Sequence, residues 1–145
     1  MFIGQHQSLC SEKNSLEIPE VYRGFFGGKV VVTQGFEKNI LILPVETFEK
    51  LSKLLMALNI TDPLVRGLQR LLLGSASYSQ IDRDGSIDLP AALKQFAGLT
   101  SKAILVGQGG YFEVWSQDGW KKQEKDLQDA QENSSRFSSL NLAGL

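Results

Sequence analysis

The side chains best suited to act as a nucleophile and its base, Cys10 and His6, lie four residues apart near the start of the chain. A strand would place both on one face, because strand side chains alternate with a period of two. No third group that could orient the histidine accompanies them. The single histidine and single cysteine also rule out a usual zinc site with several such ligands. We therefore expect no enzyme, no metal site and no cofactor, and a Cys10 buried as a small apolar side chain.

A second candidate site is the acidic stretch over residues 82–90, which carries three aspartates at alternate or nearby positions. An EF-hand calcium loop requires glycine at its sixth position and glutamate at its twelfth. Counted from the first aspartate, glycine is fourth and Leu93 is twelfth, so calcium binding is not expected. The pattern instead indicates a polar turn containing Gly85, a short alternating strand, and a closing proline that can begin a helix.

Residues 11–19 repeat this pattern 71 positions earlier. Asn14 takes the place of Gly85, and both residue types tolerate the left-handed backbone conformation that a tight turn can need. The apolar strand positions also correspond, Leu16 with Ile87 and Ile18 with Leu89. The chain therefore contains an internal repeat.

Apolar spacing predicts the elements of the first copy. We expect strands over 2–9 and 15–18, a short helix over 20–26, hairpin strands over 29–34 and 40–43, and an amphipathic helix over 45–58. Val21 and Phe25 are the apolar positions of the short helix at helical spacing. Asp62 and Pro63 then predict the N-cap and first residue of a connecting helix that ends near Leu73. We expect this helix to bury Leu64, Leu68 and either Leu71 or Leu72.

The second copy follows the same order. We expect strands over 75–81 and 86–89, a helix over 91–97 that buries Leu93 and Phe96, hairpin strands over 102–106 and 111–115, and a helix over 117–131. The Ser/Asn-rich residues beyond indicate a flexible tail. The predicted division is therefore a first copy over 1–58, a connecting helix over 59–74, a second copy over 75–131 and a tail over 132–145.

One copy of about 50 residues could hardly bury enough apolar surface to fold alone. Two copies that exchange strands around a shared core remove that difficulty. The predicted fold is therefore α/β with a β-rich core, built as a pseudo-dimer of two intertwined units within one chain. A helical hairpin lies between the units and a helix follows the second.

The charge balance restricts the possible partners. The 145 residues carry a net charge of −1, without the basic surplus that non-specific nucleic-acid binding usually shows. Nucleic-acid binding would need a local basic surface, or many weak contacts acting together. No apolar run approaches the roughly 18 residues of a membrane helix, and no signal peptide is recognisable. A cytoplasmic protein without a membrane partner is the simplest expectation.

A series of distinct short motifs extends along nearly the whole chain. The most specific is the central helix, in which Arg66 and Arg70 are followed by Gly74-Ser75-Ala76. The others are Met1-Phe2-x-Gly4, Leu16-x-Ile18-Pro19-x-x-Tyr22-Arg23, Thr33-Gln34-Gly35 through Leu43-Pro44, Asp82-x-x-Gly85, Leu89-Pro90-x-x-Leu93-Lys94, Ala97-Gly98-Leu99 and Val106-Gly107-x-Gly109 through Glu113-x-Trp115. In this order and spacing the sequence resembles the MraZ family of bacterial regulators.

The resemblance implies two AbrB-like swapped-hairpin units, assembled into a closed homo-oligomeric ring. It also implies binding to direct repeats in promoter DNA of the division and cell-wall gene cluster, and hence a nucleoid-associated protein. The family's turn is Asp-x-x-Gly-Arg, once per repeat, and its arginine is the residue expected to meet DNA. Here Ser15 and Ser86 stand in the two arginine positions. Serine offers one short hydroxyl where arginine offers a planar five-donor fork, so each contact is expected to be weaker.

The candidates for contact with double-stranded promoter DNA are Lys13, Ser15, Arg23, Arg83, Ser86 and Lys94. Lys13 and Arg83 lie in the two turns at places taken as equivalent, although solvated turn residues would give the same pattern. Arg23 and Lys94 each follow a proline by four residues, and ion pairs on a helix surface would explain them equally well. Arg66 and Arg70 are assigned a packing or subunit-interface role with carboxylate partners.

Two functions remain open because local charge does not replace the missing arginines. Residues 11–23 hold two basic against three acidic side chains, and residues 82–94 do the same, so each stretch has a net charge of −1. The leading hypothesis is a DNA-binding transcriptional regulator whose ring adds many weak contacts. The alternative is an oligomeric interaction or scaffold module that has lost DNA recognition. Neither hypothesis involves a small-molecule substrate.

Overall fold

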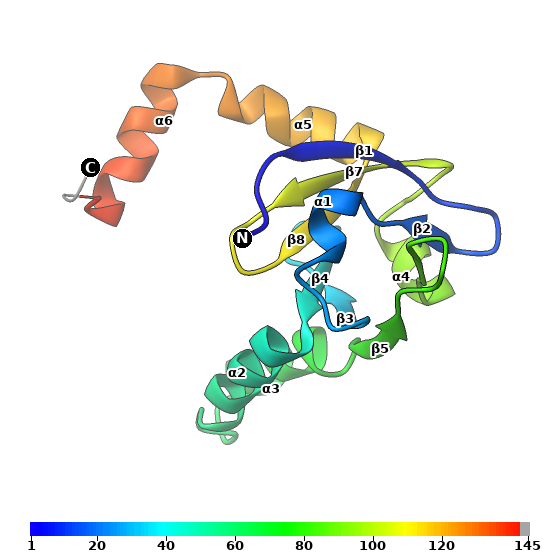
Figure 1. Ribbon diagram of the computed structural model, residues 1–145. Coiled ribbons are helices and arrows are strands. Elements are labelled where there is room, and N and C mark those ends of the chain that lie inside the picture. The colour runs from blue at the N-terminus through cyan, green and yellow to red at the C-terminus, as the bar shows by residue number, and fades with distance from the viewer. Residues whose placement is uncertain (143–145) are drawn as a thin grey trace.

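The computed structural model describes residues 1–142, which form a six-stranded antiparallel sheet with helices at both ends (Figure 1). The strand order is β1-β7-β8-β4-β3-β5, and β2 pairs with β6 in a separate short ladder. The strands are β1 (Gln5–Leu9), β2 (Ser15–Glu17), β3 (Lys29–Gln34), β4 (Ile40–Pro44), β5 (Ser77–Gln80), β6 (Ser86–Asp88), β7 (Lys102–Gly107) and β8 (Phe112–Ser116). The helices are α1 (Glu20–Arg23), α2 (Val45–Met56), α3 (Pro63–Leu72), α4 (Ala91–Phe96), α5 (Gln117–Leu127), α6 (Ala130–Phe137) and the 3₁₀ helix η1 (Ser138–Leu140).

The two copies exchange strands, as the repeat predicts. The first strand of copy one, β1, pairs with β7 of copy two, and β5 of copy two pairs with β3 of copy one. The two hairpins meet at the centre of the sheet, where β4 pairs with β8. The predicted α/β fold of two intertwined units is therefore confirmed.

An approximate twofold axis relates the copies. In the β2–β6 ladder, Leu16 lies opposite Ile87, its own equivalent 71 positions along the chain. In the centre of the sheet, Leu41 lies opposite Glu113, its equivalent 72 positions along. A residue can face its own equivalent in an antiparallel pair only where a local twofold passes between them. The axis therefore runs through both pairs.

The main core lies between the sheet and the β2–β6 ladder, and both copies contribute to it. Leu16 and Ile18 from one copy are fully buried there, and Ile87 and Leu89 from the other are at most 3% exposed. Burying a side chain of this size stabilises a fold by about 1.5–3 kcal/mol. Since side chains from the hairpin strands of both copies belong to the same cluster, neither copy forms a complete core by itself.

A helical hairpin of α2 and α3 connects the copies and projects below the sheet in Figure 1. The side chain of Asp62 accepts a hydrogen bond from the Leu64 amide at 2.9 Å, and Pro63 is the first helical residue, so the predicted cap is confirmed. Leu55 and Leu72 are buried against Leu41 and Leu43 of β4. The prediction that Leu64 is buried was wrong, because this side chain in the first turn of α3 is 80% exposed. Gln69 Nε2 donates to the Leu55 carbonyl at 3.0 Å and joins the two helices.

Two local predictions were wrong. In α1 the buried side chain is Tyr22, with Phe26 just beyond the helix, whereas Val21 and Phe25 are 62% and 49% exposed. A helix of four residues has too few turns for its apolar spacing to define a face. The predicted helix over 117–131 is broken, and most of the residues from 132 to 140, expected as an irregular tail, are helical in α6 and η1. Asp129 caps α6 by accepting from the Glu132 amide at 3.0 Å; residues 143–145 of the predicted tail lie outside the described residues.

None of the helices within residues 1–142 has the length and apolar content that crossing a bilayer requires.

Candidate nucleic-acid interface

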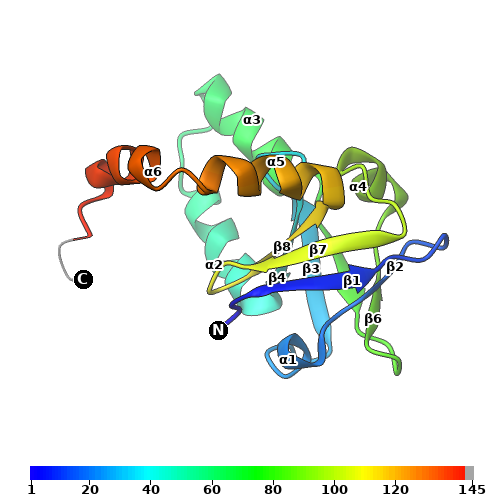
Figure 2. The ribbon, with the colours of Figure 1, turned by 90° about the horizontal axis from the view of Figure 1, so that it is seen from above.

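Two tight turns, turn 1 (residues 11–14) and turn 2 (residues 82–85), precede the strands of the β2–β6 ladder. Both project from the right-hand side of the molecule in Figures 1 and 2. In turn 1 the Asn14 amide donates to the Ser11 carbonyl at 3.0 Å, and in turn 2 the Gly85 amide donates to the Asp82 carbonyl at 3.1 Å. The two turns therefore have the same backbone hydrogen-bond pattern.

The last residue of each turn has a left-handed backbone. Its φ angle is 65° at Asn14 and 79° at Gly85, so the predicted equivalence of these positions is confirmed. The Asn14 carbonyl accepts from the Leu89 amide at 2.8 Å, and the Gly85 carbonyl accepts from the Ile18 amide at 2.9 Å. Each turn is thus attached to the strand of the other copy.

The first residue of each turn stabilises it differently. Asp82 Oδ1 accepts from the Asp84 and Ser86 amides, both at 2.9 Å. Ser11 Oγ accepts only from the Ser15 amide among these backbone groups, at 3.1 Å. Because a carboxylate makes stronger hydrogen bonds than a hydroxyl, the first residue of turn 2 stabilises its turn more than that of turn 1.

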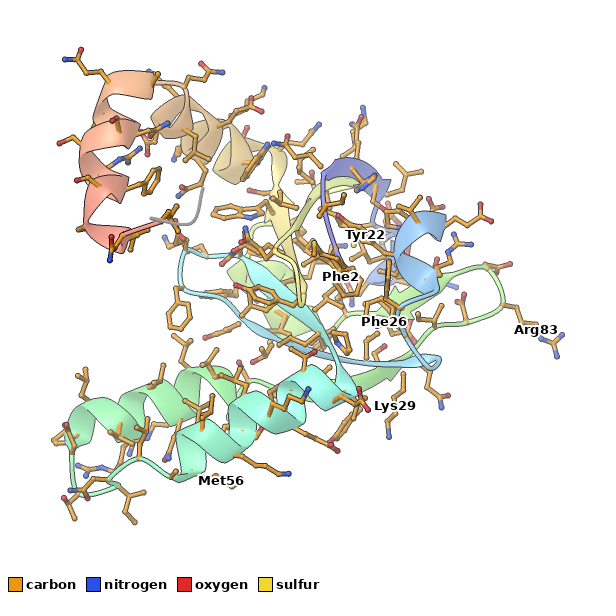
Figure 3. All side chains as sticks on the ribbon, turned by 60° about the vertical axis from the view of Figure 1, so that its left-hand side comes forward. Phe2, Tyr22, Phe26, Lys29, Met56 and Arg83 are labelled. Atoms are coloured by element: carbon orange, nitrogen blue, oxygen red, sulfur yellow. The ribbon has the colours of Figure 1, made fainter. Side chains whose placement is uncertain are left out.

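The cationic side chains of the turns, Lys13 and Arg83, are both exposed. Figure 3 shows Arg83 at the tip of turn 2, extending away from the protein. The prediction that the two positions are equivalent was wrong. The hydrogen bonds align Asn14 with Gly85, so Lys13 is the third residue of turn 1 whereas Arg83 is the second residue of turn 2. Each is accessible to a partner, from a different place on its turn.

Arg23 and Lys94 do occupy equivalent positions, and each extends to the turn of the other copy. Lys94 Nζ donates to the Ser11 carbonyl of turn 1 at 2.9 Å. Arg23 Nε donates to the Ile18 carbonyl at 2.7 Å, and its guanidinium group packs directly against Gly85 of turn 2. Both side chains are half-buried. Each of these two basic side chains therefore lies beside the turn of the other copy.

The two serines in the arginine positions are less accessible. Ser15 is half-buried, and Ser86 is only 8% exposed. Their backbones pair with Asp88 and Glu17 in the β2–β6 ladder. The side chain of Ser86 therefore presents little surface to a partner.

Arg66 and Arg70 lie on α3, in the helical hairpin and not on the turns. Both are exposed. Arg66 Nη1 donates to the Ile60 and Thr61 carbonyls at 2.8 and 3.0 Å. Within residues 1–142 the hydrogen-bond partners found for this guanidinium are main-chain carbonyls of the α2–α3 connection, and a packing or subunit-interface role with carboxylate partners stays a prediction.

His6 and Cys10 do not form a reactive pair. The His6 ring packs edge-on against Tyr22 with its centroid 4.9 Å away, while Cys10 is 3% exposed. Burial raises the pKa of the Cys10 thiol above its ordinary value, with nearby Lys94 opposing that shift, and so keeps the sulfur protonated. Among the residues that the structure describes, no three His, Cys, Asp or Glu side chains are grouped to hold a metal ion.

The contacts across the twofold axis are the feature that sequence reasoning missed. Arg23 and Lys94 were recognised as equivalent, but their targets depend on the register of β2 against β6, which residues of one copy do not define. The sequence signal that could have given this register is the correspondence of Leu16 with Ile87, because equivalent residues can face each other across a twofold axis. With that register, the basic side chain in the last turn of each short helix lies near the other copy's turn.

Comparison with known proteins adds a family assignment to this geometry. The family model described as "MraZ protein, putative antitoxin-like" matches residues 72–139. Proteins named "Transcriptional regulator MraZ" are similar over most of the chain. That of Herpetosiphon aurantiacus is 36% identical over 83% of this chain and 85% of its own length. Those of Thermomicrobium roseum and Nitrosomonas europaea are 34% and 39% identical, over 88% and 83% of this chain and 89% and 84% of their own.

Proposed function

Since the chain belongs to the MraZ family, we propose that it is a transcriptional regulator that binds double-stranded promoter DNA through turns 1 and 2. The family is one of transcriptional regulators and not of enzymes. The observation that carries the proposal is the pairing of β2 with β6, which holds two similar turns on one side of the molecule. Lys13 and Arg83 extend from these turns and supply the DNA contacts.

The proposed DNA binding is multivalent. Acidic neighbours offset the basic side chains of each turn, so a single pair of turns binds weakly. A homo-oligomeric ring that presents several pairs to spaced direct repeats gains affinity, because each further contact forms at a high effective concentration. The proposed target is the promoter of the division and cell-wall gene cluster, and the proposed location is the nucleoid.

The end of the α2–α3 hairpin supports the self-association part of the proposal. We define the hairpin tip as five exposed apolar residues of α2, α3 and their connection. Their exposed fractions are 43–80%: Leu54, Met56, Leu58, Ile60 and Leu64. Five exposed apolar side chains within eleven residues favour an interaction site at this end of the hairpin. The occupant that fits a ring is a second copy of this chain.

Fluorescence anisotropy with labelled duplexes tests the DNA-binding proposal. The specific duplex is taken from the region upstream of the chain's own gene, and a scrambled duplex of equal length is the control. We expect specific binding at low salt and a steep loss of affinity as salt is added, since phosphate contacts release counterions. The matched variant K13A/R83A should bind the specific duplex at least about tenfold more weakly, at about 1–3 kcal/mol per lost contact.

The alternative function is an oligomeric interaction or scaffold module without DNA recognition. The acidic turns and the two serines in the arginine positions favour it. The same titration separates the two functions. A protein that light scattering shows to be oligomeric, yet that binds the specific and scrambled duplexes equally at low salt, would support the alternative and contradict the regulator.

Light scattering of the variant L64E tests the ring. Leu64 is 80% exposed, so the substitution should leave the fold intact while it places a charge in the hairpin tip. We expect the wild type to be an oligomer at micromolar concentration and the variant to have a lower mass. L140E, at an exposed residue of η1, is the matched control and should keep the wild-type mass. A monomeric wild type would contradict both functions.

A further inference from the structure

We propose that the two turns bind DNA in different ways: turn 2 recognises sequence through the guanidinium groups of Arg83 and Arg23, and turn 1 holds phosphate through the ammonium groups of Lys13 and Lys94. The inference rests on the proposed DNA-binding function and assigns a separate role to each turn. It follows from which basic groups the twofold exchange brings to each turn.

Arg23 belongs to copy one but lies at turn 2. A Cβ atom on Gly85 would overlap the guanidinium group, coming within 2.5 Å of Nη2. The left-handed glycine therefore leaves the space that the guanidinium fills. Within residues 1–142, the one hydrogen bond found for this group is that from Nε to the Ile18 carbonyl. The Nε group thus holds Arg23 beside turn 2, and the two Nη groups can donate hydrogen bonds to DNA.

Lys94 belongs to copy two but lies at turn 1. Its Nζ donates one hydrogen bond to the Ser11 carbonyl and has two further protons. Asn14 stands where turn 2 has glycine, so the backbone here is less open to a planar group. Turn 1 consequently carries two lysines, and turn 2 carries two arginines.

Arginine and lysine are not interchangeable in contacts with DNA. A guanidinium group can donate two parallel hydrogen bonds to guanine O6 and N7, whereas an ammonium group acts as a point charge. Base contacts give sequence specificity, and phosphate contacts mainly give affinity. Turn 2 is also the turn whose backbone Asp82 orders with two hydrogen bonds, as a precise contact requires.

The acidic residues around turn 2 favour directed hydrogen bonds over general attraction. Asp82 and Asp84 lie in the turn itself, and Glu17 pairs with Ser86 at its end. These carboxylates cancel much of the long-range attraction that Arg23 and Arg83 exert on phosphate. The two arginines can still donate pairs of parallel hydrogen bonds, which a lysine of equal charge cannot do.

Charge-preserving substitutions test the division. The double variant R23K/R83K and the single variants R23K and R83K are titrated against the specific duplex and the scrambled duplex. We expect the double variant to lose at least about tenfold in affinity for the specific duplex and less than about twofold for the scrambled one. Each single variant should lose part of the discrimination.

The matched turn 1 variant is K13Q/K94Q. We expect it to weaken binding to both duplexes by the same factor and to reduce the salt slope by about 1 per lysine. Thermal unfolding and light scattering on every variant confirm that fold and assembly are retained. For a double variant that fails either control, its two single variants, R23K and R83K or K13Q and K94Q, supply the comparison.

Three results would overturn the inference while leaving DNA binding intact. The first is equal loss on both duplexes in R23K/R83K, and the second is a loss of discrimination in K13Q/K94Q. The third is full discrimination in R23K, which would remove Arg23 from the contact. A wild type that does not discriminate between the duplexes is a separate outcome, because it contradicts the proposed function itself.

Discussion

Turn 1 and turn 2 have the same backbone conformation but differ in almost every side chain that reaches the surface. Each turn ends on a residue with a left-handed backbone, and the amide of that residue donates to the carbonyl of the first residue of the turn. Yet turn 1 begins with a hydroxyl and carries lysine in third place, whereas turn 2 begins with a carboxylate and carries arginine in second place. The common backbone conformation follows from the β2–β6 ladder, which does not constrain the exposed side chains of the two turns.

The same contrast extends into the core. Around α1, Phe26 stacks on Phe2 with 5.2 Å between ring centroids, and Phe112 packs beside them at 5.4 Å from Phe2. At the position equivalent to Phe26, copy two has Ala97. The core beside α1 is thus packed by aromatic rings, one of them from copy two, whereas the position equivalent to Phe26 holds only the methyl group of Ala97. The twofold symmetry holds for the backbone and not for the side-chain volumes.

The largest expected effect comes from making copy one resemble copy two in the core. Phe26→Ala removes a ring from the aromatic cluster, which cannot collapse around the gap. We expect a loss of about 3–5 kcal/mol in the free energy of unfolding, measured in urea. The reciprocal change, Ala97→Phe, should cost about 1–3 kcal/mol by overpacking. A loss below 1 kcal/mol for Phe26→Ala would mean that the two halves tolerate exchange.

The next largest effect comes from the last residues of the turns. Gly85→Ala should cost about 2–3 kcal/mol, because alanine is strained at a φ of 79° and its Cβ displaces Arg23. Asn14→Ala should cost about 1 kcal/mol from backbone strain alone. Urea unfolding measures both. In an Arg23→Ala background the cost of Gly85→Ala should fall, and an unchanged cost would contradict the contact across the axis.

Sequence reasoning recovered the features that depend on local chemistry. The left-handed positions of Asn14 and Gly85, the cap at Asp62 and the strand exchange all follow from residue type and repetition. The buried face of α1 did not follow, because Tyr22 and Val21 are both apolar neighbours on a helix of one turn. The contact between Arg23 and Gly85 did not follow either, since it depends on a register between distant segments.

A smaller effect should separate the first residues of the turns. Asp82→Ala leaves the Asp84 and Ser86 amides without their acceptor, at a cost of about 1–2 kcal/mol. Ser11→Ala affects only the Ser15 amide and should cost about 0.5–1 kcal/mol. Hydrogen exchange measures the change, with faster exchange expected at Ser86 than in the wild type. Asp82→Asn keeps an acceptor and should retain most of the protection, and unchanged exchange in Asp82→Ala would contradict the cap.

The smallest effect concerns Cys10, which stands where copy two has Ile81. Burial raises the pKa of the thiol above its ordinary value of 9.0, so the unfolded chain loses this proton at lower pH than the folded protein. Stability is therefore complete below about pH 9 and falls as the pH rises through the folded pKa. Urea unfolding from pH 7 to 10 should show a shallower decline in Cys10→Ala. Equal declines would contradict burial of the thiol.

The most direct test of the DNA-binding surface is photo-cross-linking from positions beside the basic residues. A photoreactive amino acid replaces Glu12 in turn 1, Asp84 in turn 2 or Ile60 at the hairpin tip, all of which are exposed. Lys13 and Arg83 remain in place in every variant. With the specific duplex, we predict cross-links to DNA from positions 12 and 84 and none from position 60. Cross-links from position 60 alone, or from none of the three with bound DNA present, would contradict the assignment of the turns as the DNA-binding surface.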